Sequence, residues 1–342
     1  MKALLLTDVC KFEYTDVPTP EPKAGEVQIN IKACSICNSD VHGYDGTSGR
    51  RQPGVIMGHE ASGVITKVGE GVTRFKVGDN VVFNSVKYCG ECWYCRHGLE
   101  NMCENGCCFG IKTATQHLDG AMAEYLCVPE YICYKMPEGL SFERAAMLEP
   151  LAIMVHAIGG VDIKINDTVV MFGSGVMGLM GIKALKATGA GKVIVVEVDE
   201  FKKEMARKNG ADYVIDGRED VPARIKELTD GLGADYAFDT AGVKATIANG
   251  FHCLKKNGTL VQVGNISPTV EAPLQTLVNS QIHWIGRYGT FTEYEGALHL
   301  VGSGKVSVDD CLSKVAPLQE GQEWFERLHA MEPGLLKVVL VP

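Results

Sequence analysis

The sequence predicts a two-domain α/β protein, in which a mostly β first part is followed by a doubly wound parallel sheet. The first 150 residues are rich in Gly, Pro, Asn and Asp and contain short β-rich runs at 27–31, 63–68 and 80–83, which is typical of a β domain. After residue 151, strand-like and helix-like segments alternate, which favours a parallel sheet with helices on both faces. A chain of 342 residues can bury two such cores.

The composition is that of an ordered globular protein, with 46% hydrophobic and 22% charged residues. The formal net charge of −9 argues against non-specific binding to nucleic acid or to an anionic membrane. Near the start only residues 3–6 form an apolar run, which is too short for a signal peptide or a membrane span. We therefore expect a cytoplasmic protein that does not associate with membranes.

The chain has thirteen cysteines; those that are clustered are expected to bind metal rather than form disulfides, because the chain carries no secretion signal. The densest cluster is YCGECWYCRHGLENMC, with C-x2-C-x2-C-x7-C spacing. Four thiolates this close can complete a tetrahedral shell around zinc and leave no position for substrate. The predicted ligands of this structural zinc are Cys89, Cys92, Cys95 and Cys103. Redox-active cysteines are the alternative, since Cys107 and Cys108 follow closely; we interpret these two as packing residues.

A second set of possible metal ligands is spread over CNSDVH at 37–42, GHE at 58–60 and LEP at 148–150. A catalytic zinc needs about three protein ligands of mixed N, S and O type and one open position. Cys37, His59 and a carboxylate could form that shell. Each of these residues alone is more often structural, and their occurrence together with a dinucleotide loop favours catalysis.

The dinucleotide loop is predicted between two apolar runs, where three glycines have G-x-G-x-x-G spacing. The first glycine allows a tight turn, the second lets backbone N–H groups approach a pyrophosphate, and the third lets helix and strand pack closely. The helix N-terminus adds unpaired N–H donors. The predicted cofactor-binding residues of the loop are Gly173, Gly175, Val176, Met177 and Gly178. The alternative is a strand-to-helix turn that binds nothing.

Glu197 is the predicted ribose-binding acid, because it ends the next strand roughly 20 residues after the third glycine. Its carboxylate can accept hydrogen bonds from both ribose hydroxyls and would repel a 2′-phosphate, which predicts NAD rather than NADP. Val198 offers no arginine for such a phosphate. Asp199 and Glu200 are competing acids, but the strand ends at Glu197.

The remaining elements complete the alternation of strands and helices. Helices are expected at 176–188, 200–209, 295–301 and 320–329, and strands at 168–172, 192–197, 213–215, 236–239, 259–263 and 283–285. The last fifty or so residues, with an extended segment at 334–340, depart from this alternation and are expected to return to the first domain. The predicted domains are therefore 1–152, 153–290 and a returning segment, 291–342.

The chain resembles the zinc-dependent medium-chain alcohol dehydrogenase superfamily over nearly its whole length. The motifs that carry the resemblance occur in the family's order: CNSDVH, GHEASG, the four-cysteine segment, LEP, GSGVMG, DTAG and VGN. The resemblance implies a GroES-like β domain that holds two zinc ions and a Rossmann domain that binds NAD. It also implies a small-molecule alcohol substrate and assembly into a homodimer or homotetramer.

The resemblance assigns ligands to the catalytic zinc. Cys37 and His59 match two of the ligands, and Glu149 matches the third ligand or its water-bridged equivalent. Glu60 matches an acid beside the metal that can coordinate it when substrate is absent.

The resemblance also assigns proton transfer. Ser39 and His42 match proton-relay positions, and Asp40 matches a residue that orients the site. In such a site zinc acts as a Lewis acid that lowers the pKa of the alcohol, and the nicotinamide accepts the hydride.

Two features resemble the polyol branch of the family, which includes sorbitol and xylitol dehydrogenases. Glu149 stands where ordinary alcohol dehydrogenases often have a cysteine, and together with Pro150 it forms an E-P dipeptide like that of the polyol branch. Arg287 and Tyr288 resemble a pair that faces substrate and cofactor, although a surface salt bridge would also explain Arg287. One departure is Gly43, which stands where many polyol enzymes have an aromatic residue.

The predicted activity is zinc-dependent transfer of a hydride from a secondary alcohol of a polyol or sugar-derived substrate to NAD. Alternative substrates are L-threonine, 2,3-butanediol and a phosphorylated sugar alcohol. Arg50 and Arg51 could bind a phosphate, or they could simply be exposed loop residues. A non-catalytic nucleotide-binding protein is a further alternative, and the intact set of Cys37, His59 and Glu149 argues against it.

Overall fold

The computed structural model describes all residues from 1 to 342, and they form two compact units. The first unit contains Met1–Glu149, Thr290–Gly304 and Cys311–Pro342, so the end of the chain returns to it. The second unit contains Pro150–Gly289 and Lys305–Asp310. The domain boundaries expected after residues 152 and 290 stay predictions.

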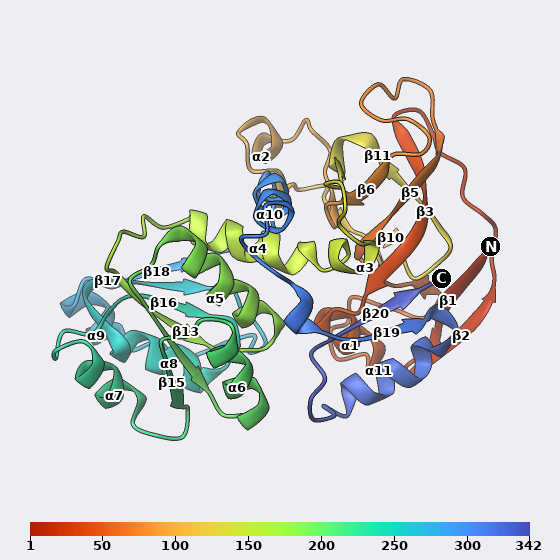
Figure 1. Ribbon diagram of the computed structural model, residues 1–342. Helices are drawn as coiled ribbons and strands as arrows, with labels where there is room; N and C mark the ends of the chain where they lie inside the picture. Colours follow the sequence, from red (N-terminus) through yellow and green to blue (C-terminus); the bar gives the residue numbers. More distant parts are fainter. The chain divides into compact units, whose positions relative to one another are not determined.

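A seven-stranded sheet forms the centre of the first unit (Figure 1). Its path is β12 (Cys133–Lys135), β6 (Asn80–Phe83), β5 (Glu60–Val68), β3 (Glu26–Ser35), β20 (Lys337–Val341) and β19 (Leu312–Pro317), with β11 (Tyr125–Pro129) also pairing with β3. All pairs are antiparallel except β19 with β20. Because β20 pairs with β3, the last strand of the chain is hydrogen-bonded next to one of the first.

Short elements complete the first unit. The strands are β1 (Lys2–Asp8), β2 (Lys11–Asp16), β4 (Val55–Ile56), β7 (Val86–Lys87), β8 (Cys107–Cys108), β9 (Ile111–Lys112) and β10 (His117–Leu118). The helices are α1 (Asn38–Tyr44), α2 (Trp93–Arg96), α3 (Phe142–Ala145), α10 (Glu293–Gly302) and α11 (Gly321–His329). The first 150 residues are thus mostly β, as the sequence predicts.

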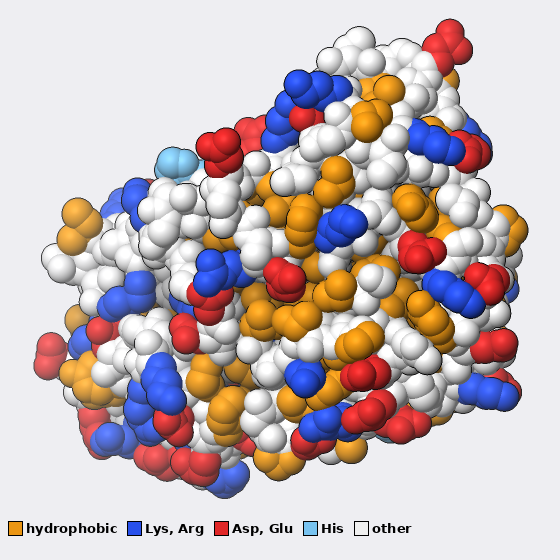
Figure 2. Space-filling model, turned by 45° about the vertical axis from the view of Figure 1, so that its right-hand side comes forward, with side chains coloured by type: hydrophobic (Ala, Val, Ile, Leu, Met, Phe, Trp, Pro, Cys, Tyr) orange, Lys and Arg blue, Asp and Glu red, His pale blue; other side chains and the backbone are white.

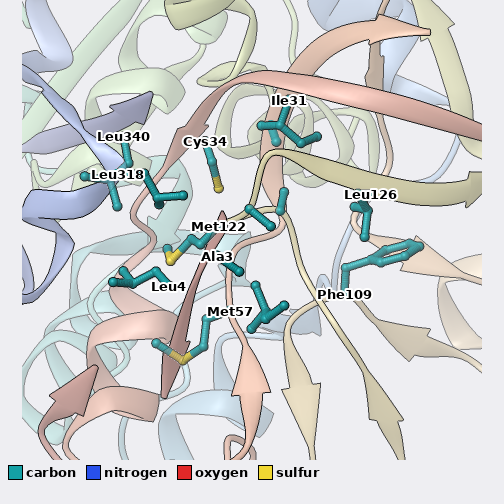
Figure 3. Close-up of a cluster of buried hydrophobic side chains, with 14 of the residues drawn as sticks. Ala3, Leu4, Ile31, Cys34, Met57, Phe109, Met122, Leu126, Leu318 and Leu340 are labelled. Atoms are coloured by element: carbon teal, nitrogen blue, oxygen red, sulfur yellow. The ribbon is translucent and has the colours of Figure 1, made fainter. Parts of the chain in front are cut away.

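The core of the first unit joins segments that are far apart in the chain. Figure 3 shows Leu4, Ile31, Cys34, Met122 and Leu340 together, and each of them is almost completely buried. Burying a Leu or Ile side chain contributes about 1.5–3 kcal/mol. The packing therefore holds the returning C-terminal strand against the N-terminal sheet.

The second unit contains a six-stranded parallel sheet with the order β15-β14-β13-β16-β17-β18 (Figure 1). Its strands are β13 (Thr168–Phe172), β14 (Lys192–Glu197), β15 (Tyr213–Asp216), β16 (Ala234–Asp239), β17 (Leu254–Gln262) and β18 (His283–Gly286). The helices between them are α5 (Val176–Thr188), α6 (Glu200–Lys208), α7 (Val221–Leu228), α8 (Lys244–Cys253) and α9 (Leu274–Asn279). The strand order reverses at β13, which makes this the doubly wound fold that binds dinucleotides.

Helix α4 (Leu148–Gly159) lies outside the helices expected from the sequence. Nearly all of its residues are buried, from Leu148 to Ile158. A helix that is apolar all round lacks the 3.6-residue alternation by which a surface helix is recognised. Glu149 lies in its first turn, so the missed helix carries one of the candidate zinc ligands.

Basic and acidic side chains are interspersed on the face shown in Figure 2, with hydrophobic side chains between them. Neither charge therefore dominates this face. No helix combines the length and the apolar composition that a bilayer-spanning segment needs.

Candidate metal sites, active site and dinucleotide loop

The four cysteines predicted to bind structural zinc lie together, with their sulfur atoms within 4.8 Å of one another. Adjacent Sγ atoms are 3.5–3.9 Å apart. A zinc ion with four sulfurs at about 2.3 Å needs edges of about 3.8 Å between them. The donor set therefore fits a tetrahedral zinc with four thiolate ligands. None of the thirteen cysteines of the chain forms a disulfide.

Backbone donors lower the thiol pKa of two of the four cysteines, Cys89 and Cys92. The N–H groups of Glu91 and Cys92 lower the pKa of Cys89 to about 6, whereas burial raises the pKa of Cys95 to about 12. Thiolate is the form that binds metal. Cys107 and Cys108 are outside the cluster and form β8, which pairs with β7.

Helix α1 presents the first candidate catalytic residues. Cys37 is its N-cap residue, and the Asp40 carboxylate accepts a hydrogen bond from the Cys37 N–H at 3.2 Å. Ser39 and His42 are exposed and three positions apart, which places both on one face of the helix. The Ser39 hydroxyl lies 3.3 Å from the Cys37 sulfur and donates to it.

A second group of metal-ligating side chains contains Cys37, His59 and Glu60, whose ligand atoms lie within 4.8 Å of one another. Strand β5 begins at Glu60 and pairs with β3, where Glu60 is opposite Ser35. The group offers sulfur, nitrogen and oxygen, and it has fewer protein ligands than the four-cysteine cluster. A mixed set of three is the donor set of a catalytic zinc with an open position.

Glu149 is buried but does not belong to this 4.8 Å group. Its Oε1 accepts a hydrogen bond from the Ser85 hydroxyl at 3.0 Å. Burial raises the pKa of Glu149 to about 7, and the charge of Glu60 acts in the same direction. Two carboxylates therefore lie beside the candidate metal ligands, and Glu60 is the one within ligand distance.

Glu60 forms a buried ion pair that the sequence analysis missed. Lys337 Nζ lies 2.6 Å from Oε2 and 2.8 Å from Oε1 of Glu60, and the Ser35 hydroxyl also donates to Oε2. Glu60 raises the pKa of Lys337 against the opposing effect of burial. A buried charge needs such a partner. Lys337 lies in β20, so the returning segment supplies it.

Asp40 is completely buried and connects His59 to Arg51. Its Oδ1 lies 3.3 Å from His59 Nδ1 and 2.8 Å from Arg51 Nη2. Burial raises the pKa of Asp40, but the charges of His59 and Arg51 outweigh it and hold that pKa below its usual range. With Nδ1 facing Asp40, Nε2 is the ring nitrogen left for a metal. Arg51, considered as an exposed loop residue, is in fact buried.

The glycine loop has the geometry that a dinucleotide site needs. Gly173 has φ +88°, which favours glycine, and a Cβ on Gly178 would lie 2.0 Å from the Gly173 carbonyl oxygen. A Cβ on Gly175, the N-cap residue of α5, would meet nothing within 4 Å. Open space at this helix start leaves room for a phosphate close to the backbone. Val176 and Met177 begin the helix.

Glu197 is held at the end of β14 by four donors. Its Oε2 accepts from Ser174 N–H at 2.8 Å and from the Ser174 hydroxyl at 3.2 Å. Its Oε1 accepts from the N–H groups of Val198 at 2.7 Å and Asp199 at 3.1 Å. The carboxylate therefore points back to the glycine loop, one residue from Gly173.

Arg287 follows β18 and contacts α4. Its Nη2 donates to the His156 carbonyl at 2.9 Å and lies 3.4 Å from His156 Nδ1. Gly160 makes this approach possible, since a Cβ there would lie 2.6 Å from Arg287 Nε. The arginine is half-buried, and its role toward the cofactor stays a prediction. The neighbouring Tyr288 is 49% exposed.

The fold and these sites define a zinc-binding dehydrogenase with a doubly wound nucleotide-binding sheet. Residues 23–138 match the alcohol dehydrogenase GroES-like domain, and residues 176–303 match the zinc-binding dehydrogenase domain. D-xylulose reductase A of Aspergillus oryzae is 33% identical over 340 residues, which cover 96% of this chain and 93% of that protein. The chain therefore belongs to the zinc-binding alcohol dehydrogenase family.

Two solved structures extend the comparison. The 2R,3R-butanediol dehydrogenase of Bacillus subtilis is 30% identical, with a TM-score of 0.89 and coverage of 100% of this chain and 99% of that one. A zinc-binding dehydrogenase of Sinorhizobium meliloti bound to NADP is 28% identical, with a TM-score of 0.90 and the same coverage. The protein is thus an enzyme of small-molecule alcohols that uses zinc and a nicotinamide cofactor.

Proposed function

We propose that this enzyme transfers a hydride from a secondary alcohol of a polyol or sugar-derived substrate to NAD. The observation that carries the proposal is the mixed group of Cys37, His59 and Glu60 beside the Ser39 hydroxyl. The similarity to a D-xylulose reductase supports a polyol. The similarity to a butanediol dehydrogenase makes 2,3-butanediol the second candidate.

Two zinc ions per chain account for the two groups of ligands. The four cysteines leave no position for substrate and would hold a structural zinc. Cys37 and His59 would hold the second ion, with Glu60 as the carboxylate at rest and Glu149 as its direct or water-bridged replacement. When bound there, zinc would supply Lewis-acid polarisation of the alcohol oxygen.

Residues of α1 transfer the hydroxyl proton of the substrate to solvent. Ser39 takes the hydroxyl proton of the substrate and passes its own hydroxyl proton on toward His42, since its oxygen is exposed beside Cys37. His42 is exposed on the same face of α1 and passes the proton on to solvent. Asp40 and Ser85 act indirectly, because they hold His59 and Glu149 in place.

NAD is the proposed cofactor because Glu197 is the acid at the loop. The competing acids are engaged elsewhere: Asp199 caps α6 by accepting from Lys202 N–H at 2.9 Å, and Glu200 lies 2.9 Å from Lys203. Arg218 is the nearby cation that could bind a 2′-phosphate, but its guanidinium is bonded to Asp216 and to the Val198 carbonyl.

A phosphorylated substrate is less well supported. Arg51 is buried and paired with Asp40, which removes one of the two arginines considered for a phosphate. Arg50 remains exposed. An unphosphorylated polyol therefore fits these residues better.

Assembly into a homodimer or homotetramer is supported by the sheet of the second unit. Strand β18 has a partner on one side only, and most of its residues are exposed, including Trp284 at 38%. Proteins usually cover such an edge, and a second copy of the chain could do so. None of the thirteen cysteines is in a disulfide, which suits a reducing cytoplasm.

The activity is tested by a substrate panel with NAD and NADP side by side. The panel contains xylitol, sorbitol, 2,3-butanediol, L-threonine and a sugar-alcohol phosphate, and absorbance reports the reduced nicotinamide. We expect the highest kcat/KM for a polyol with NAD, and loss of turnover after chelation of zinc. Zinc-loaded protein that oxidises none of these alcohols would contradict the proposal.

Replacing Glu197 should change the choice of cofactor. A hydrogen bond to a charged group is worth about 1.5–3 kcal/mol, so the NAD dissociation constant of Glu197→Ala should rise at least about tenfold. NADP should bind no worse, because a repelling charge has been removed. Isothermal titration with both cofactors checks this, with the exposed Glu204→Ala as a control. Equal weakening of NAD and NADP would indicate a damaged loop and refute the ribose role.

Metal analysis tests the pairing of ligand groups. Purified protein should contain two zinc ions per chain. Cys95→Ser should remove one ion and lower the thermal midpoint, because structural zinc contributes to folding. Cys37→Ser should remove turnover while the protein still folds. Cys10→Ser replaces an exposed cysteine outside both groups and should change neither the zinc content nor the thermal midpoint nor the turnover. One zinc ion in the unmodified protein would count against this account.

A further inference from the structure

Arg51 is a buried arginine that bonds to two residues of the candidate active site. Its side chain is 4% exposed, and its guanidinium contacts the fully buried Asp40, with Nε 3.0 Å and Nη2 2.8 Å from Oδ1. Nη2 also donates to the Ser39 hydroxyl at 3.1 Å. The fork of the guanidinium therefore connects the proposed proton acceptor to the carboxylate that faces His59.

Gly43 provides the space that Arg51 occupies. A Cβ on Gly43 would lie 2.0 Å from Arg51 Cδ and 2.9 Å from its Cβ and Cγ. Gly43 is not among the glycines with positive φ, and it lies inside helix α1. Glycine costs a helix about 1 kcal/mol relative to alanine. Backbone conformation does not require this glycine, and the buried arginine does.

The bonding pattern distinguishes Arg51 from a substrate-binding arginine. Nε and Nη2 are already paired with Asp40 and Ser39, and the side chain is shielded from solvent. Asp40 uses Oδ1 for Arg51 and His59, and Oδ2 for the Cys37 N–H. Arg51 thus contacts Ser39 and Asp40, which in turn contact the candidate metal ligands Cys37 and His59. In this network Arg51 itself contacts neither metal ligand.

We propose that Arg51 is a positioning residue, which orients the Ser39 hydroxyl and, through Asp40, the ring of His59, and that Gly43 is the residue that admits it. The orientation of the Ser39 hydroxyl matters only if the proposed function is right. The orientation of the His59 ring affects how well the protein retains metal, whatever the reaction. Lysine has a single ammonium and cannot reproduce the planar fork that reaches both partners.

The experiment compares Arg51→Gln, Arg51→Lys, Gly43→Ala and the double variant Gly43→Ala/Arg51→Gln. Four quantities are measured: kcat and KM for the alcohol oxidised best, the rate of zinc transfer to a coloured chelator, and the thermal midpoint. Arg207→Gln and Gly159→Ala are matched controls, since Arg207 is exposed and a Cβ on Gly159 meets nothing within 4 Å.

Arg51→Gln should lower kcat about 10–100-fold, the usual cost of losing a residue behind a metal ligand, and should speed zinc transfer. KM for the alcohol should change little. Arg51→Lys should recover part of the loss. Gly43→Ala should resemble Arg51→Gln, yet should add nothing to it in the double variant, because no guanidinium is then left to be displaced from Asp40 and Ser39.

Each contrary outcome overturns the proposal. A raised KM with unchanged kcat would make Arg51 a substrate-binding residue. If kcat and the rate of zinc transfer are unchanged in Arg51→Gln, Arg51 is not a positioning residue. Additive effects of the two substitutions on kcat or zinc transfer would show that Gly43 does not act through Arg51. If Arg51→Gln does not fold, Arg51→Lys and Gly43→Ala provide the same comparison. If the enzyme oxidises no alcohol, zinc transfer still tests Arg51, so the two failures can be told apart.

Discussion

The buried carboxylate of Asp40 is the interaction on which the candidate active site depends. It accepts from the Cys37 N–H, faces His59 Nδ1 and pairs with Arg51, while no part of it reaches solvent. A charge buried to this extent is tolerated only with well-placed partners. Its partners therefore fix one another: the start of α1, the ring of a candidate zinc ligand and a buried guanidinium.

A second buried ion pair explains why the last strand of the chain returns to the first unit. Glu60 lies among the candidate zinc ligands, and its partner Lys337 comes from the last strand. Because β20 pairs with β3, the returning segment is part of the first unit and completes its charge balance. The nucleotide-binding sheet is complete without that strand. The candidate metal ligands and proton-transfer residues thus lie in one unit, and the glycine loop lies in the other.

Sequence patterns predicted the local features well. Strands β13 and β14 and helix α5 have the expected limits, and the four cysteines meet as their spacing requires, because neighbouring residues determine both. Lys337 and Arg51 could not be found in this way. Their partners are distant in the chain or depend on packing, and the only local signal was Gly43, an unexplained glycine. Helix α4 was missed because burial on all sides removes its periodicity.

In the proposed reaction the alcohol carbon gives its hydrogen directly to the nicotinamide. Xylitol with deuterium on its secondary carbons, incubated with the zinc-loaded enzyme and NAD, tests this claim when the reduced nicotinamide is analysed by mass spectrometry. We predict one deuterium in each reduced nicotinamide. Cys37→Ser should form no reduced nicotinamide. Reduced nicotinamide that contains only ordinary hydrogen would contradict direct transfer.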